Sequence, residues 1–248
     1  MFVHYRTLGL IFKKDDRGEA DQLFTIYTKD FGKLEILGKA IRKISSKLRS
    51  GAELFYLAEI EFIQGKTQKT LTDTILINKF ENLRKDLKRL RIACRISEVL
   101  NSLVKSPEPD EKIWQLLNET FEKLNTYNLK PITYNLIYYH FLWNLLSVLG
   151  YTPELYNCAL CQKKITPEDL YFNLKEGGVI CGGCTEGKEI QPETIKILRI
   201  ILKKDWKTLS KLKIEAKYLK EIEDVSKNYL SLIVDEAEAS SPASILIN

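Results

Sequence analysis

The first third of the chain alternates short apolar runs with polar turns, a pattern typical of β-strands. The runs predict five strands: Leu8–Phe12, Leu23–Thr28, Lys33–Leu37, Leu54–Phe62 and Thr70–Ile77. A polar turn at Lys13–Glu19 separates the first two strands, and a long basic connection, Gly38–Gly51, separates the third from the fourth. This arrangement predicts a small closed barrel, for which an OB-fold is the best match and an SH3-like barrel the main alternative.

From Asn78 the apolar residues recur at steps of three and four, which predicts amphipathic helices. Asn78 and Glu81 match a capping box at the start of the first helix, which ends at Ser106–Pro109. A second helix is expected from about Asp110 to Tyr127.

Pro131 begins a third helix that is apolar on nearly all sides, so it should form the centre of a helical domain. Its apolar run, Ile132–Leu149, is long enough to span a membrane but contains Asn135 and His140, among other polar residues, which are costly in lipid. We therefore expect a buried helix and no membrane partner. Helical spacing resumes after Pro192, and the last fourteen residues, from Asp235, are expected to be frayed or disordered.

Four of the five cysteines form two Cys-x-x-Cys pairs, Cys158/Cys161 and Cys181/Cys184, separated by nineteen residues. This spacing predicts one tetrahedral Zn²⁺ ion held by four thiolates, a structural site that leaves no position for substrate. Two disulfides in a secreted protein are the alternative. Zinc is favoured because the first residues lack the long apolar run of a signal peptide, which also predicts a cytoplasmic location.

The residues around the four cysteines predict a small hairpin formed by Leu170–Leu174 and Gly178–Ile180. Gly182 and Gly183 should free the backbone for the tight turn of the second cysteine pair. The remaining cysteine, Cys94, is expected to be a small buried hydrophobic residue in a helix. The predicted fold is therefore α+β, with a barrel at residues 1–79 and a helical domain at 80–248 that carries a zinc module at about 156–190.

The 248-residue chain has a formal net charge of only +5, but two stretches are rich in basic residues: residues 33–49 carry six against one acidic residue, and residues 79–95 carry seven against two. This concentration predicts a polyanionic partner, although a basic helix face such as residues 79–95 is as often merely solvated. On an OB-fold, the loops and the long connection would carry the contacts to nucleic acid. The candidate DNA-binding residues are Lys13, Lys14, Arg17, Lys33, Lys39, Arg42, Lys43, Lys47, Arg49, Lys66 and Lys69. The candidate stacking aromatics, each weighed against a role in the core, are Phe24, Tyr27 and Phe31.

No catalytic residue is predicted. The chain has two histidines, His4 near the terminus and His140 inside an apolar helix, where a hydrogen-bonded core role is expected. Gly65-Lys66-Thr67 resembles the end of a phosphate-binding loop, but no glycine lies five positions before Gly65. The tripeptide is therefore interpreted as a turn. No spacing indicates a nucleophile–base pair, paired catalytic carboxylates or an open metal site, and we expect no enzyme.

The order of several short motifs resembles the RecO family of bacterial recombination mediators. The motifs, which cover most of the chain, are Tyr5-Arg6-Thr7-Leu8-Gly9-Leu10-Ile11, Gly18-Glu19-Ala20-Asp21, Tyr27–Lys33, Gly38-Lys39-Ala40-Ile41-Arg42-Lys43 and Leu149–Leu155. The resemblance implies a protein of the bacterial nucleoid that binds single- and double-stranded DNA and anneals complementary strands without ATP. It further implies action on DNA coated by single-stranded DNA-binding protein (SSB), contact with the SSB C-terminal tail through the helical domain, and assistance to RecR in loading RecA.

The resemblance also carries site residues over by position. The basic barrel residues of the family correspond to Lys39, Arg42 and Lys43, and the zinc ligands to the four paired cysteines. The resemblance does not place the pocket for the SSB tail on particular residues; basic helix positions that would suit the carboxylate of that tail are Arg84, Lys88 and Arg91. Two other hypotheses about function stay open. One is a zinc-ribbon interaction adaptor without DNA affinity of its own. The other is a nucleic-acid enzyme such as a nuclease, which the sequence disfavours because it lacks a cluster of acidic residues.

Overall fold

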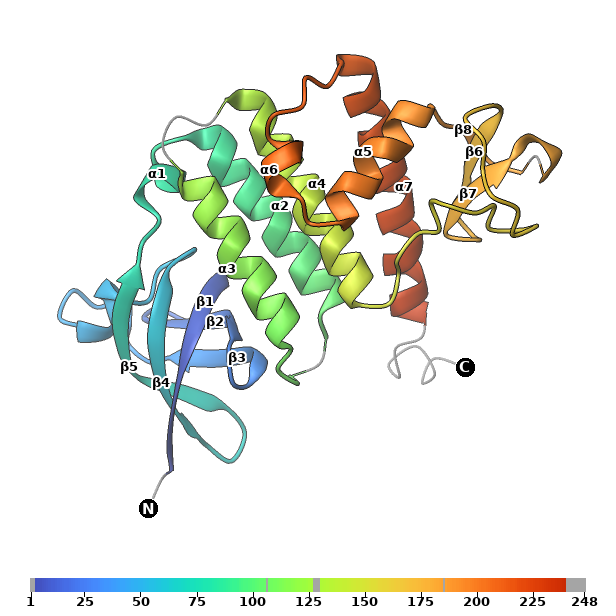
Figure 1. Cartoon of the computed structure of the whole chain (residues 1–248). Coiled ribbons are helices and arrows are strands. Elements are labelled where there is room, and N and C mark those ends of the chain that lie inside the picture. Colours follow the sequence, from blue (N-terminus) through green and yellow to red (C-terminus); the bar gives the residue numbers. More distant parts are fainter. Residues whose placement is uncertain (1–2, 106, 127–129, 185, 240–248) are drawn as a thin grey trace. The chain divides into compact units, whose positions relative to one another are not determined.

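The protein is described here from a computed structural model that covers residues 3–105, 107–126, 130–184 and 186–239 (Figure 1). The chain forms two compact units, residues 1–134 and 135–248. The division at residues 79 and 80, expected from the sequence, stays a prediction.

A closed five-stranded barrel forms the start of the first unit. Its strands are β1 (His4–Arg17), β2 (Asp21–Thr28), β3 (Gly32–Gly38), β4 (Leu57–Gln64) and β5 (Lys69–Asn78). The order around the barrel is β1-β2-β3-β5-β4, and β4 closes onto β1. All neighbours are antiparallel except β3 and β5, which run parallel and pair only at Ile36–Lys69 and Leu37–Thr70. The predicted OB-like barrel is confirmed.

The barrel closes around side chains that alternate along the strands, as a half-buried strand requires. On β4, Ala58, Ile60 and Phe62 are buried, while the residues between them are partly exposed. The same core contains fully buried side chains of the other strands, among them Ile11, Phe24, Ile26 and Ile36.

The first strand is longer than the sequence predicted. Residues Lys13–Arg17, expected in a turn, continue β1 and pair with Asp21–Thr25 of β2 after a register shift at Ile11–Lys13. The turn is limited to residues 18–20, where Gly18 has φ +60°. The sequence did not predict this part of the strand, because Lys13–Arg17 is polar throughout. A strand segment with neither face in the barrel core shows no alternation of apolar and polar residues.

The helices of the first unit are α1 (Glu81–Arg84), α2 (Leu87–Leu103) and α3 (Glu111–Asn125). The predicted capping box is wrong: the residue that caps α1 is Phe80, and Asn78 Oδ1 instead accepts a 2.9 Å bond from the N–H of Phe80. The expected single helix is divided in two, because Asp86 accepts bonds from Lys88 N and Arg89 N and so starts α2. Asp110 caps α3 in the same way.

In the second unit, the central helix α4 (Pro131–Val148, which begins in the first unit) is buried from Phe141 to Leu146, as predicted. Its residues Asn144, His140 and Trp143 contact Ile201 of α5 (Pro192–Leu202), Trp206 of α6 (Trp206–Leu209) and Tyr229 of α7 (Ala216–Ala239), respectively. Trp143 of α4 stacks on Tyr229 of α7 at 5.4 Å and donates a 2.9 Å bond from Nε1 to Ser226. The fraying expected from Asp235 is wrong as far as Ala239, where α7 ends, and residues 240–248 lie outside the described residues.

A small three-stranded sheet interrupts the helices of this unit, coloured gold in Figure 1. It consists of β6 (Leu170–Asn173), β7 (Gly178–Cys181) and β8 (Lys188–Glu189) in the order β7-β6-β8. The β6–β7 pair is the predicted hairpin. Among the described residues, no helix is both long and apolar enough to cross a membrane.

Candidate nucleic-acid interface and cysteine site

The basic connection between β3 and β4 is folded onto the barrel. Ile41 and Ala52 lie in the barrel core, with exposed fractions of 1% and 4%. The N–H of Arg42 donates a 3.0 Å bond to Ala20 O, and the N–H of Ala40 donates a 2.7 Å bond to Asp21 Oδ1. A 3₁₀ turn, η1 (Lys47–Ser50), then lies beside β5, where Thr74 Oγ1 donates to Leu48 O at 3.0 Å. The segment from Gly38 to Gly51, hereafter the basic segment, therefore has a defined conformation.

The cationic side chains of the basic segment all point into solvent: Lys39, Arg42, Lys43, Lys47 and Arg49 are exposed. Arg42 has an acidic partner, Asp16, at 3.2 Å. Across the described ranges, the other four form no ion pair. Because the segment contains no acidic residue, its positive charge is available to a polyanion.

The remaining candidate residues of the barrel have different surroundings. Lys13 pairs with Asp15 at 2.8 Å, and Lys14 pairs with Glu53. Arg17 and Lys66 are exposed, whereas Lys69 is half-buried at the start of β5. The ion pairs of Lys13 and Lys14 compete with any phosphate contact, since each cation would have to leave an existing carboxylate.

Lys33 is turned toward the end of α2. Its ammonium donates to the carbonyls of Asn101 at 3.0 Å and Val104 at 2.9 Å. Burial, together with the nearby charges of Lys105 and Lys13, lowers the pKa of Lys33. A cation at a helix C-terminus satisfies free carbonyls and opposes the negative end of the helix dipole. Lys33 therefore has a structural role inside the first unit, and its contact with DNA stays a prediction.

Two of the three candidate stacking aromatics are core residues. Phe24 and Tyr27 are both fully buried, so exposed stacking surfaces at these positions are ruled out by the fold. Tyr27 Oη lies 3.3 Å from both Asp110 O and Asp110 N, and burial raises the pKa of Tyr27 to about 12. Phe31 packs edge-to-face on Tyr5 and Phe62. The sequence could not separate these roles, because the same alternation fills a barrel or presents a stacking platform.

The predicted basic helix, residues 79–95, is not one uniform solvated face. Lys88 and Arg91 are exposed, but the Arg84 guanidinium lies 4.5 Å from the centre of the Tyr56 ring and donates to Leu54 O. Arg89, by contrast, has only 7% of its surface exposed.

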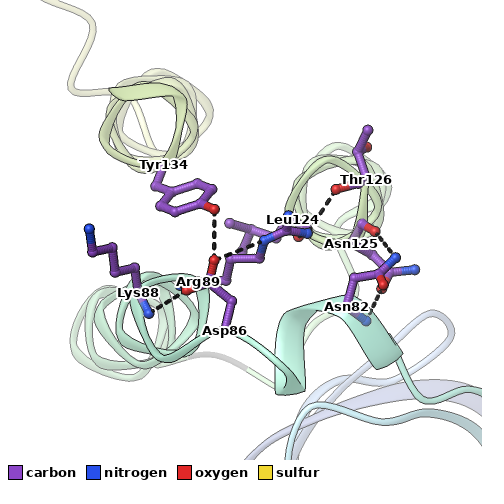
Figure 2. Close-up of polar contacts among 8 residues, drawn as sticks. All are labelled: Asn82, Asp86, Lys88, Arg89, Leu124, Asn125, Thr126 and Tyr134. Atoms are coloured by element: carbon purple, nitrogen blue, oxygen red, sulfur yellow. Dashed lines mark hydrogen bonds and ion pairs between the residues drawn. The ribbon is translucent and has the colours of Figure 1, made fainter. Parts of the chain in front are cut away.

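Figure 2 shows Arg89 at the centre of a polar network. Its Nη1 donates to Leu124 O at 3.0 Å and Thr126 O at 2.7 Å, and its Nε lies 3.6 Å from Asp86 Oδ2. Tyr134 donates to the same Asp86 oxygen at 2.7 Å, which is the first cause of the lowered pKa of Asp86. Arg89 thus satisfies the carbonyls at the end of α3, a role that a charge pattern alone did not reveal.

The four paired cysteines meet at one point of the second unit. The sulfur atoms of Cys158, Cys161, Cys181 and Cys184 all lie within 4.8 Å of one another. The five cysteines of the chain are free thiols, so the disulfide alternative finds no support in this geometry. A tetrahedral ion with Zn–S bonds of about 2.3 Å requires sulfur atoms about 3.8 Å apart. The Cys161–Cys181 separation is 3.8 Å.

The backbone around the cluster favours thiolate sulfur. The N–H groups of Cys161 and Cys181 both lie 3.5 Å from Cys158 Sγ. Burial acts to raise the pKa of Cys158, but these N–H groups, together with the N–H of Leu160 and the Cys161 thiol, outweigh it and lower that pKa to about 6. Burial and the three other thiols raise the pKa of Cys184 to about 12. A bound cation would remove this disparity, because metal binding deprotonates its thiol ligands. The residues therefore fit a metal ion held by four thiolates.

The glycines of the second cysteine pair act differently from the expectation. Neither Gly182 nor Gly183 has a positive φ. Gly182 is needed for space instead, because a Cβ there would lie 2.7 Å from Asp169 Cβ. Positive φ occurs at non-glycine residues of the module, Gln162 and Asp169.

An OB-like barrel with an exposed basic segment, followed along the chain by helices and a four-cysteine cluster that could bind a metal ion, defines a barrel-plus-helix class of protein. Comparison with known families assigns both parts. Residues 1–80 match the family described as "Recombination protein O N terminal", and residues 84–242 match "Recombination protein O C terminal".

Curated relatives agree along most of the chain. The DNA repair protein RecO of Dehalococcoides mccartyi strain BAV1 is 32% identical over 222 residues, 88% of this chain and 86% of the relative. RecO of Thermoanaerobacter sp. strain X514 is 26% identical over 91% of this chain and 90% of the relative, and RecO of Acetivibrio thermocellus is 27% identical over 92% and 90%. The chain belongs to the RecO family of DNA repair and recombination proteins.

Proposed function

We propose that this protein binds DNA through its barrel and anneals complementary strands without ATP, as a mediator of recombinational repair. The observation that carries the proposal is the basic segment: five exposed cations, one of them paired, on a backbone anchored by Ile41 and Ala52. Neutralising the phosphates of two strands removes the repulsion that keeps them apart, and no bond is made or broken by the protein.

The proposed contacts are graded by their surroundings. Lys39, Lys43, Lys47 and Arg49 are the primary phosphate contacts because they have no acidic partner among the described residues. Arg42, Arg17 and Lys66 are secondary. Lys13, Lys14, Lys33 and Lys69 are retained as candidates, although the first three already bind carboxylates or carbonyls.

We propose Zn²⁺ as the metal of the four-thiol site, with a structural role. Soft thiolates in a tetrahedral arrangement select zinc or an iron–sulfur cluster, and a closed four-ligand zinc site supplies folding free energy. The ion would hold the cysteine turns and the β6–β7 hairpin together, and no chemical step is assigned to it.

The partners in the proposal follow from membership of the family. The protein would act in the cytoplasm on single-stranded DNA coated by SSB, contact the C-terminal tail of SSB through its helices, and help RecR to load RecA. Exposed Lys88 and Arg91 of α2 are available to the carboxylate of that tail. Arg84 is already engaged with Tyr56 and Leu54, which makes it a weaker candidate.

The test is annealing of two complementary labelled oligonucleotides, bare or SSB-coated, with ATP absent. We expect acceleration in both cases. Acceleration on bare DNA alone would remove the SSB contact from the proposal. An absence of both annealing and DNA binding at moderate salt would refute the proposal and favour a zinc-ribbon adaptor that acts only through protein contacts.

A further inference from the structure

Ile44 is the most exposed large apolar side chain among the described residues. Its exposed fraction is 94%, compared with 82% for Leu87 and 63% for Val3. It lies in the middle of the basic segment, between the cations Arg42 and Lys43 on one side and Lys47 and Arg49 on the other. Full exposure of an isoleucine forgoes the stabilisation that burial of its side chain would supply.

The backbone holds Ile44 at the tip of a turn. The N–H of Ser46 donates to Lys43 O at 3.0 Å, which makes Lys43–Ser46 a β-turn with Ile44 as its second residue. The preceding turn is closed by a 3.1 Å bond from Lys43 N to Ala40 O. Proline and polar residues normally occupy such corners, and a β-branched apolar residue contributes nothing to the turn.

The anchor residues fix the direction of the tip relative to the barrel. Ile41, three residues earlier, is buried in the barrel core, and Leu48, four residues later, packs partly against it. The same short stretch therefore contains two apolar residues that face inward and one that faces outward. Packing inside the barrel explains Ile41 and Leu48 but leaves Ile44 unexplained.

We propose that Ile44 inserts between adjacent bases of single-stranded DNA while the surrounding cations hold the phosphates. Proteins that kink duplex DNA insert an isoleucine, leucine or phenylalanine between base steps and partly unstack them, and Ile44 would make the same contact with the bases of a single strand. The surrounding charge favours a polyanionic partner, because the segment offers only cations next to the apolar tip, and the proposed function makes DNA that polyanion. The inference rests on the proposed DNA-binding function and adds a residue that the charge pattern did not identify.

An unstacked strand is a better substrate for annealing, since its bases are presented to the complement. Ile44 would thus link the electrostatic contacts of the basic segment to the exposure of bases. Its contribution to binding is apolar, so it should be independent of salt, unlike that of the lysines around it.

The experiment uses the full-length protein and a single-stranded oligonucleotide with one 2-aminopurine, whose fluorescence rises when the base loses its stacking. Wild-type protein should raise the fluorescence. Ile44→Ala should abolish the rise and weaken binding roughly tenfold, with the slope of log K against log salt unchanged. Ile44→Lys should steepen that slope by about one unit and still give no rise.

The matched control is Leu87→Ala, which removes another exposed apolar side chain next to basic residues; it should leave the fluorescence rise intact. A rise of equal size with Ile44→Ala would overturn the inference. An Ile44→Ala protein that binds DNA as wild type does but no longer binds RecR would also overturn it, because Ile44 would then contact a protein and not bases. If wild-type protein binds no DNA, the proposed function itself fails. If wild-type protein binds and anneals DNA without a fluorescence rise, only the role of Ile44 fails.

Discussion

The ammonium of Lys33, on the third barrel strand, donates a 2.9 Å hydrogen bond to the carbonyl of Val104, the residue that caps the end of α2. A second bond reaches Asn101 O. Sequence position alone places Lys33 at the start of a basic cluster, whereas the structure gives it a partner that DNA would have to displace.

Lys33→Met should therefore reduce stability more than DNA binding. Two carbonyls of α2 lose a charged donor, and we expect a loss of roughly 1–3 kcal/mol in the free energy of unfolding. Urea denaturation measures this loss, and salt titration of DNA binding provides the comparison. A normal unfolding curve with a salt slope reduced by a full unit would show that Lys33 is mainly a phosphate contact.

Combined replacement of Lys39, Arg42 and Lys43 by alanine tests the basic segment. Each lost phosphate contact should lower the slope of log K against log salt by about 0.7–0.9, so the triple variant should lose about two to three units. The matched control changes three exposed lysines of the second unit, Lys207, Lys211 and Lys213, and so removes the same charge. Equal effects of the two triple variants would mean that net charge, and not the segment, governs binding.

Cys158→Ser should eliminate most of the bound metal, because Cys158 is the buried member of the cluster and accepts both backbone N–H groups. Metal content should fall from about one ion per chain to near zero, and a chelator should no longer lower the melting temperature further. Cys94→Ser serves as the control outside the cluster. Unchanged zinc content and melting in Cys158→Ser would contradict the structural site.

Glu61 should make stability depend on acid pH. Hydrogen bonds from His4, Arg6 and Thr72 lower the pKa of Glu61 from 4.5 to about 2. Because the folded-state pKa is the lower one, this stabilisation is fully present above about pH 4.5 and is lost as the pH falls toward 2.

The measurement is the difference in unfolding free energy between wild type and Glu61→Gln along that pH range. It should shrink steadily on acidification. Glu59→Gln is the control, since Glu59 has only a 3.7 Å contact with Arg6. A difference that stays constant with pH would mean that the Glu61 carboxylate is not held by these donors in solution.

Arg89→Met should be the most destabilising of the single changes, by about 3 kcal/mol, because it leaves Asp86 and the end of α3 without their buried cation. Arg89→Lys should recover part of the loss, since an ammonium can reach only some of the oxygens that the guanidinium contacts. Thermal and urea unfolding measure both. Wild-type stability in Arg89→Met would show that the network of Figure 2 contributes little.

Regular patterns predicted most of the architecture. Alternation along β4 and the apolar run of α4 gave both elements to within a few residues, because burial on one side, or on all sides, determines the pattern. The Cys-x-x-Cys spacing likewise predicted that four sulfur atoms would meet. These features depend on residues near one another in sequence.

The errors occurred where a distant partner decides the outcome. Lys13–Arg17 became strand because β2 pairs with it, and Asp86 divided the expected helix by accepting two backbone N–H groups. The charge pattern predicted Arg89 and Lys33 to be surface cations, yet both donate hydrogen bonds to carbonyls of elements far along the chain. A charge pattern counts cations but does not show which of them already have an internal acceptor.

The contacts of Tyr27, Gly32 and Lys33 also set where the first unit can be divided. Tyr27 Oη contacts the backbone of Asp110, and a Cβ on Gly32 would lie 2.3 Å from Glu108 O. A fragment that stops at residue 79 would retain all five barrel strands but expose the side of the barrel that residues 107–110 cover. We expect such a fragment to aggregate, whereas a fragment that continues through α3 should stay monodisperse. A stable N-terminal fragment of this protein should therefore end beyond the last barrel strand.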